Sequence, residues 1–253
     1  MEIAIKELLN TLEKQENITI LFACESGSRA WGTDSASSDY DVRFIYIQEV
    51  DWYLQLFEGR DVIEISPNDK VEMVGWDLKK ALKLLQKSNP TLLEWIHSPI
   101  IYLCESAFTA KLKTLSQLAF SSIPTIHHYL NMARKNYQSL PKEKRTTTKR
   151  YLNILRPLLS CLWILDNQEM PKNDITLLSH QYMNDPKLDQ QIDLLLQSKQ
   201  NGQEYFESMH LNKYFEETFS VIEERIKNVQ KVNLMPINTL NDFFLEIVKK
   251  GNS

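Results

Sequence analysis

Two short polar segments near the N-terminus carry the residue types that handle a nucleotide. Gly27 and Ser28 lie within Glu25-Ser26-Gly27-Ser28-Arg29-Ala30-Trp31-Gly32, and Asp39 and Asp41 follow about a dozen residues later. A glycine-containing turn lets backbone N–H groups approach phosphate, because glycine has no side chain in the way, and the start of a helix adds unpaired donors. The turn is therefore a predicted phosphate-binding site.

The two aspartates have the spacing of metal ligands on a strand. Asp39 and Asp41 stand at positions i and i+2 at the head of the strand-like run 40–47, so strand alternation places both on one face. Carboxylate oxygens in this arrangement suit Mg²⁺. Arg43 is the next residue on the same face, and we expect it to pair with the aspartates or to contact phosphate.

The expected chemistry is nucleotidyl transfer, which needs positioning and charge neutralisation more than covalent chemistry. We therefore expect a nucleoside triphosphate, two Mg²⁺ ions and a third carboxylate. Glu64 and Glu72 are both candidates for this third acid. We prefer Glu72, because it is the lone acid in the apolar segment Val71-Glu72-Met73-Val74. Gly27 and Ser28 would bind the β- and γ-phosphates, Arg29 is a further candidate for the triphosphate, and an incoming hydroxyl would attack the α-phosphorus.

Hydrophobic periodicity indicates the elements that position these residues. It predicts a helix at 3–14, strands at 18–24, 40–47, 61–65 and 70–74, a short helix at 27–33 and a helix at 77–87 capped by Asp77. Strand-like segments end after Pro99. Helices are predicted at 91–97, before this residue, and at 106–120, 124–139, 146–166, 173–183, 187–198, 202–229 and 239–250 beyond it. The expected fold class is α+β, with a small mixed sheet in a catalytic domain at 1–105 and an all-helical domain at 106–253.

The helical half offers three candidate nucleotide-binding residues, Lys149, Tyr151 and Arg156. Lys149 and Arg156 are two turns apart on one face of the helix predicted at 146–166. We expect this helix to close over the nucleotide from the second domain. A solvated basic face with no ligand is the alternative interpretation.

Composition limits the classes of function. The net charge of −4 gives no general attraction to nucleic acid, so RNA binding would need a local basic patch. The three cysteines are scattered, which argues against a disulfide framework and against a zinc ribbon. The chain has no apolar run near the ~20 residues that span a bilayer and no signal-peptide pattern, so we expect a cytoplasmic protein with no membrane partner. It carries no signal for an oligomeric state.

The order of the motifs resembles the DNA polymerase β-like nucleotidyltransferase superfamily. The amino-acid sequence is similar to that of the group called RlaP, for RNA repair pathway DNA polymerase β family, over about residues 18–166. The similar segments are ESGSRAWG, SDYDVRFIYI, DWYLQL, DVIEI, GWDLKKALKLLQKSNPTLLEWIHSPIIY and KRYLNILRPLLSCLWI. The resemblance implies that catalysis falls on Gly27, Ser28, Asp39, Asp41 and Glu72, although relatives often have Asp where this chain has Glu72.

The resemblance implies a Mg²⁺-dependent transfer of an NMP from an NTP to a hydroxyl acceptor, with release of pyrophosphate. An RNA end, in RNA repair, is one candidate acceptor. Two alternatives stay open: transfer to a protein hydroxyl (AMPylation), as in antitoxin-type relatives of the superfamily, and a module that senses NTP–Mg²⁺ without turnover.

Overall fold

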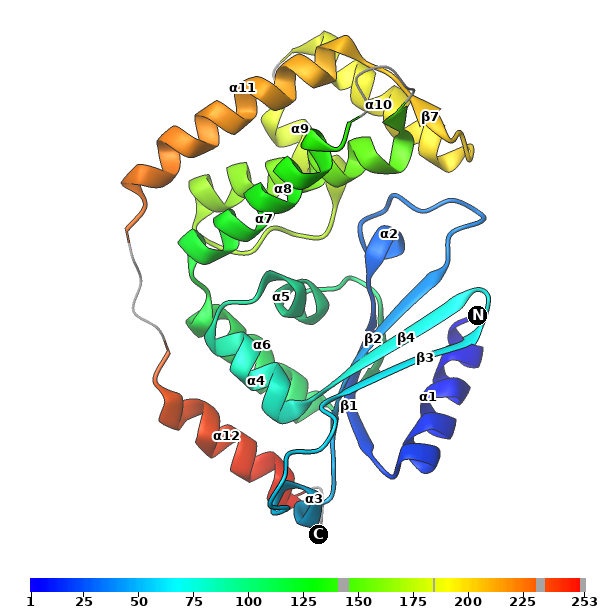
Figure 1. The fold of residues 1–253 in the computed structure, drawn as a ribbon, viewed down its shortest axis with the longest axis vertical. Helices are drawn as coiled ribbons and strands as arrows, with labels where there is room; N and C mark the ends of the chain where they lie inside the picture. Colours follow the sequence, from blue (N-terminus) through cyan, green and yellow to red (C-terminus); the bar gives the residue numbers. More distant parts are fainter. Residues whose placement is uncertain (141–145, 184, 231–234, 251–253) are drawn as a thin grey trace. The chain divides into compact units, whose positions relative to one another are not determined.

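A computed structural model describes residues 1–140, 146–183, 185–230 and 235–250, which form two compact units (Figure 1). The first unit contains residues 1–30 and 39–119 together with the described part of 234–253. The second contains residues 31–38 and the described part of 120–233. No helix in these described ranges is both long and apolar enough to span a membrane.

The first unit is built on a five-stranded mixed sheet with strand order β3-β4-β2-β1-β5. Its strands are β1 (Thr19–Glu25), β2 (Tyr40–Ile47), β3 (Val62–Asn68), β4 (Val71–Asp77) and β5 (Ile101–Cys104). The β2–β4 pair is parallel, whereas β1–β2, β1–β5 and β3–β4 are antiparallel. The predicted α+β class with a small mixed sheet is confirmed.

Apolar side chains hold the helices on the two faces of this sheet. Helix α1 (Glu2–Glu16) buries Ile5, Leu9 and Leu12, which recur at helical spacing, in one cluster with Phe44 and Tyr46 of β2. Helices α4 (Leu78–Gln86), α5 (Pro90–Ile96) and α6 (Ser106–Ala119) lie on the other side of the sheet (Figure 1). Since Phe44 faces α1, strand alternation turns the odd-numbered residues of β2 at 41 and 43 toward the opposite face.

A close contact between β2 and β4 gives the first testable prediction. A Cβ atom at Gly75 would lie 2.0 Å from the ring of Phe44, which is fully buried. We expect Gly75→Ala to lower the free energy of unfolding by about 1–3 kcal/mol, because the ring has no free space to move into. Urea denaturation measures the loss, and Phe44→Leu in the same chain should recover part of it. Equal midpoints for Gly75→Ala and wild type would contradict the contact.

Two elements of the first unit were not predicted. The expectation that strands end at Pro99 is wrong, because β5 pairs with the edge of β1. Its four residues are too few to show a period, and the buried strand β1 needs a second neighbour for its backbone groups. The short helix α3 (Val50–Tyr53) follows β2 and was also missed.

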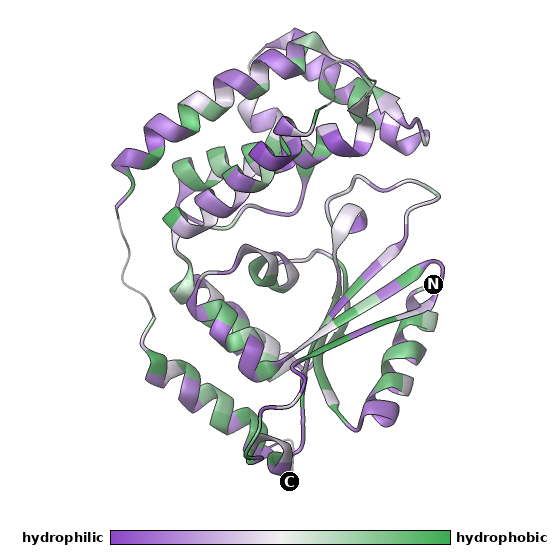
Figure 2. Cartoon of the chain, viewed as in Figure 1, coloured by the Kyte–Doolittle hydropathy of each residue, from purple (hydrophilic) through white to green (hydrophobic). Residues whose placement is uncertain are grey.

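The C-terminal helix α12 (Ile237–Lys250) belongs to the first unit. Leu240, Phe243 and Val248 form its buried face, and the ring of Phe243 stacks on Phe108 of α6 with centroids 5.6 Å apart. Figure 2 shows the alternation of hydrophobic and hydrophilic residues along α4 and α12. The sequence-based boundary at residue 105 places both α6 and α12 in the helical domain at 106–253. The compact units divide the chain differently, because both helices belong to the first unit.

The second unit is largely helical. Helix α8 (Thr148–Asn167) is buried along most of its length and contacts α7 (Ser122–Gln138), α9 (Ile175–Tyr182), α10 (Pro186–Gln200) and α11 (Met209–Arg225). A 3₁₀ turn (Ile226–Asn228) follows α11. The helix predicted at 202–229 begins only at Met209, because β7 (Tyr205–Phe206) pairs with β6 (Thr146–Thr147).

Candidate functional site

The predicted phosphate turn follows β1 directly and lies against Asp41. Gly27 begins the four-residue helix α2 (Gly27–Ala30) with a φ of +59°, a conformation that favours glycine. A Cβ atom at this position would lie 1.9 Å from Oδ2 of Asp41. Only glycine leaves room for the carboxylate at this position. The turn is therefore in direct contact with Asp41.

Backbone and side-chain hydrogen bonds fix Asp41 at this place. The N–H of Ser26 donates to the carbonyl of Asp41 at 2.8 Å, and the N–H of Asp41 donates to Oε1 of Glu25 at 2.7 Å. The carboxylate itself is partly exposed, with 29% of the side-chain surface accessible. Asp41 thus has a fixed backbone and a carboxylate that solvent can reach.

Arg29 lies beside Asp39 and Tyr40. Its Nε donates to the carbonyl oxygen of Asp39 at 3.2 Å, and its guanidinium stands over the ring of Tyr40, 3.9 Å from the centroid. Asp39 precedes β2, which begins at Tyr40. Arg29 therefore contacts the backbone of one of the predicted acids, and its role toward a triphosphate stays a prediction.

Parallel pairing places Glu72 of β4 next to Asp41 of β2. Arg43 joins them, because its Nη2 lies 3.2 Å from Oδ1 of Asp41 and 2.9 Å from Oε1 of Glu72. Glu64 is on β3, one strand further from β2, opposite Val74. Of the two candidates for the third acid, the register therefore brings Glu72 closer to Asp41.

The residues at this place meet the needs of Mg²⁺ only in part. Asp41 and Glu72 supply carboxylate oxygens, the type of ligand that Mg²⁺ prefers, and one positive charge of Arg43 already lies between them. Within the described residues, no group of three His, Cys, Asp or Glu side chains is close enough together to hold a metal ion. Asp41 and Glu72 therefore have the ligand chemistry that a hard cation prefers. The three predicted acids do not form one cluster in the described part of the chain.

In the second unit, the three predicted nucleotide-binding residues have different surroundings. Lys149 is exposed in the first turn of α8. The guanidinium of Arg156 stands over the ring of Trp31, 4.8 Å from its centroid, and Trp31 is buried within the same unit. Arg156 thereby packs the segment 31–38 onto α8.

Tyr151 is a core residue. It is 2% exposed, its hydroxyl donates to Asn212 at 3.0 Å and accepts from the N–H of Ser208, and its ring contacts Phe206 and Phe215. This packing leaves the ring no surface for a nucleotide. In the sequence, a core tyrosine and a tyrosine that stacks on a base look the same, and only the neighbours of Tyr151 distinguish the two roles.

Glu25 and Tyr102 were not predicted as site residues. The carboxyl of Glu25 is completely buried and accepts hydrogen bonds from Asp41 and from the hydroxyl of Tyr102. Burial raises the pKa of Glu25 above its ordinary value, and these two hydrogen bonds oppose the shift. The sequence feature that could have indicated Glu25 is its place as the single acid that ends the apolar run before Gly27.

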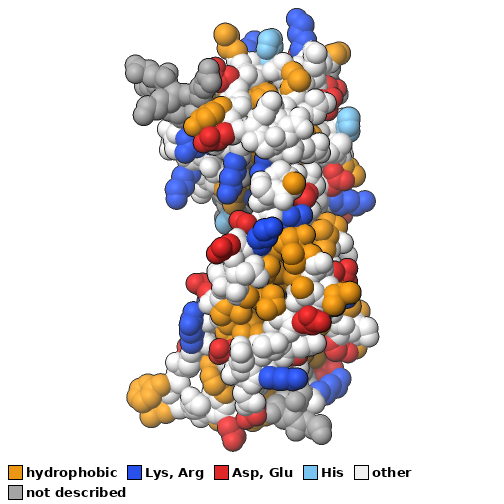
Figure 3. Space-filling view, turned by 90° about the vertical axis from the view of Figure 1, so that its right-hand side faces the viewer, with side chains coloured by type: hydrophobic (Ala, Val, Ile, Leu, Met, Phe, Trp, Pro, Cys, Tyr) orange, Lys and Arg blue, Asp and Glu red, His pale blue; other side chains and the backbone are white. Residues whose placement is uncertain are grey.

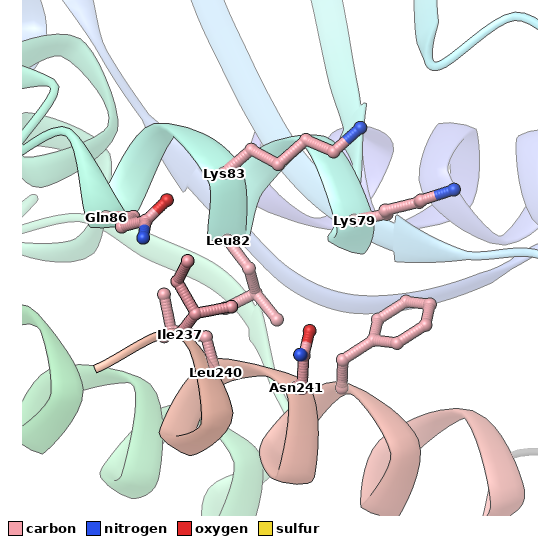
Figure 4. Close-up of a pocket in the computed structure, with 8 residues that line it drawn as sticks. Lys79, Leu82, Lys83, Gln86, Ile237, Leu240 and Asn241 are labelled. Atoms are coloured by element: carbon pink, nitrogen blue, oxygen red, sulfur yellow. The ribbon is translucent and has the colours of Figure 1, made fainter. Parts of the chain in front are cut away.

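A separate pocket of about 180 Å³ lies between α4 and α12. Figure 4 shows Leu82 of α4 facing Ile237 and Leu240 of α12, with the side chains of Lys79 and Lys83 directed away from them. None of the predicted site residues lines this pocket.

The family whose model matches this chain agrees with the motifs. The model of the family described as "RlaP: RNA repair pathway DNA polymerase beta family" matches residues 1–246. An uncharacterized protein, YcgL of Bacillus subtilis (strain 168), is 39% identical over 204 residues, which cover 81% of this chain and 78% of the relative. The crystal structure of a nucleotidyltransferase-like protein from Exiguobacterium sibiricum 255-15 aligns over 97% of this chain and 80% of its own, with 13% identity and a TM-score of 0.32.

Proposed function

The chain belongs to the RlaP family, the RNA repair pathway DNA polymerase beta family, and on this premise we propose that it is a Mg²⁺-dependent nucleotidyltransferase. It would transfer an NMP from an NTP to a hydroxyl acceptor and release pyrophosphate. The observation that carries the proposal is the contact between Gly27 and the carboxylate of Asp41. A phosphate held at the turn would lie beside the acid that the reaction requires.

Each residue near the turn has a proposed task. Gly27 and Ser28 bind the β- and γ-phosphates through backbone N–H groups and the hydroxyl, and Arg29 adds a positive charge beside them. Asp39, Asp41 and Glu72 would hold two Mg²⁺ ions, which would neutralise charge on the phosphates when bound. Arg43 then gives up its ion pairs with Asp41 and Glu72 and turns to phosphate. Lys149 and Arg156, both on α8, are further proposed nucleotide-binding residues.

The reaction itself is a displacement at the α-phosphorus. The oxygen of the acceptor hydroxyl forms a bond to that phosphorus, and the bond between the α-phosphorus and the oxygen that bridges to the β-phosphate breaks. Pyrophosphate leaves with the electron pair of that bond. Glu72 is the proposed group that orients the hydroxyl and accepts its proton.

The acceptor that we propose is an RNA end, in keeping with the description of the family. The net charge of −4 gives no general attraction to RNA. On the face shown in Figure 3, Lys and Arg side chains alternate with Asp and Glu side chains. Recognition of RNA would therefore depend on a small local area and on single-stranded ends.

Turnover of α-³²P-labelled NTPs tests this function. We expect label in a defined RNA with a free 3′-hydroxyl, equimolar release of pyrophosphate, and complete loss of both when EDTA removes Mg²⁺. If mass spectrometry of co-purified proteins shows the label in protein, the acceptor is a protein hydroxyl and not an RNA end. Turnover that persists in EDTA would contradict the role of the metal.

One observation favours a second candidate, an NTP–Mg²⁺ sensor without turnover. The part of the chain that the structure describes has no cluster of three acids, and a sensor needs fewer ligands than a two-metal catalyst. Tight binding of NTP–Mg²⁺ in calorimetry, with no pyrophosphate released across RNA, protein and small-molecule acceptors, would favour this second function.

A further inference from the structure

Glu25 links three strands of the sheet at the candidate site. It is the last residue of β1, and Oε1 of its carboxyl accepts the N–H of Asp41, at the start of β2, at 2.7 Å. Its Oε2 accepts the hydroxyl of Tyr102, which is 6% exposed on β5. The chain of hydrogen bonds therefore crosses from β5 through β1 to β2.

The backbone of Glu25 is fixed as well. Its N–H donates to the carbonyl of Ile100 at 2.9 Å, and its carbonyl accepts the hydroxyl of Ser98 at 2.6 Å. A buried carboxyl is costly unless hydrogen bonds satisfy it, and an apolar side chain would fill the same place at lower cost. The surroundings of Glu25 are thus arranged to hold a carboxyl at this point.

Glu25, at the end of β1, and the next residue, Ser26, bind the two backbone polar groups of Asp41. Glu25 binds its N–H through the side chain, and Ser26 binds its carbonyl through the backbone. The next residue, Gly27, is in contact with the carboxylate of Asp41. In an ordinary ladder a carbonyl would accept the N–H of Asp41, whereas here a side-chain oxygen does so, and Tyr102 donates to the other oxygen of that side chain.

We propose that Glu25 is a positioning residue that sets the place of the Asp41 carboxylate against the Gly27 turn, and that Tyr102 orients Glu25 for this task. The significance for catalysis rests on the proposed function, in which Asp41 binds a metal ion. The positioning itself is a property of the chain and can be measured without turnover.

Three variants separate positioning from simple support of the fold. Glu25→Ala removes both hydrogen bonds. Glu25→Gln keeps an oxygen for the N–H of Asp41 and offers an amide to the oxygen of Tyr102, so it is the conservative rescue. Tyr102→Phe removes only the hydroxyl. Its matched control is Tyr46→Phe, because Tyr46 is a buried tyrosine of the same sheet whose hydroxyl has no hydrogen-bond partner among the described residues.

Amide hydrogen exchange, followed by NMR on the full ¹⁵N-labelled chain, reports positioning directly. We expect exchange at the Asp41 amide to rise at least about tenfold in Glu25→Ala, with a smaller rise in Tyr102→Phe. The Phe44 amide, further along β2, should keep its rate. Glu25→Gln and Tyr46→Phe should match wild type. An unchanged Asp41 amide in Glu25→Ala, or equal acceleration at Phe44, would overturn the proposal.

Kinetics on the same variants then connect positioning with function. We expect kcat for NTP turnover to fall about 100-fold in Glu25→Ala while KM for NTP changes little, since a displaced carboxylate affects the transition state more than binding. Glu25→Gln should recover most of kcat. If the variants show the expected exchange pattern but the wild type turns over no NTP, the proposed function is wrong and the positioning role of Glu25 stands. Full turnover in Glu25→Ala despite a faster Asp41 amide would remove the catalytic significance of Glu25.

Discussion

Asp41→Asn is expected to lower NTP turnover about 10²- to 10³-fold, and Asp39→Asn/Asp41→Asn is expected to abolish it. Asparagine keeps the size of the side chain and removes the charge that would hold Mg²⁺. The hydrogen bonds that fix Asp41 to Glu25 and Ser26 use its backbone, so they survive the substitution. The loss should therefore come from chemistry and not from unfolding.

The measurement is label transfer from α-³²P-NTP, with thermal unfolding recorded for each variant. Asp69→Asn is the matched control, because it removes the same charge from an exposed position in the turn between β3 and β4. Wild-type turnover is expected for this control. Undiminished label transfer by the double variant would remove the assignment of the site.

Gly27→Ala should have an effect of similar size for a different reason. The new Cβ would stand 1.9 Å from Oδ2 and 2.8 Å from Cγ of Asp41, so the carboxylate must leave its place. A shift of about 1 Å at a catalytic group can cost about 100-fold in rate. The positive φ adds about 1–2 kcal/mol of backbone strain, which lowers stability without preventing folding.

Gly202→Ala separates the two effects of this substitution. Gly202 has a φ of +70°, and an added Cβ there meets no atom within 4 Å. Both alanine variants should lose a similar free energy of unfolding, measured in urea, while only Gly27→Ala loses turnover. If Gly27→Ala turned over NTP at the wild-type rate, the contact between the turn and Asp41 would have no part in the reaction.

The sequence alone determined the local features of this protein. The apolar run that became β1, the strand-like run that became β2 and the spacing of Ile5, Leu9 and Leu12 on α1 all reflect periods within one element. The cap of α4 is also local, since the side chain of Asp77 accepts the N–H of Lys79 two residues away, at 2.8 Å. The similar segments over about residues 18–166 pointed to the family whose model matches residues 1–246.

Tertiary structure decided which of these features meet. The strand order that sets Glu72 beside Asp41, the ion pairs of Arg43 with both acids and the bond of Glu25 to Asp41 join residues of different strands. A tyrosine can stack on a nucleotide or pack in a core. Only the packing of Phe206 and Phe215 against Tyr151 shows that it is a core residue. Periodicity records which face of an element is apolar, whereas long-range pairing depends on the free energy of the whole assembly. For that reason the sequence could supply the residue types of a candidate site, whereas the supporting hydrogen bonds from Glu25 and Tyr102 could not be predicted from it.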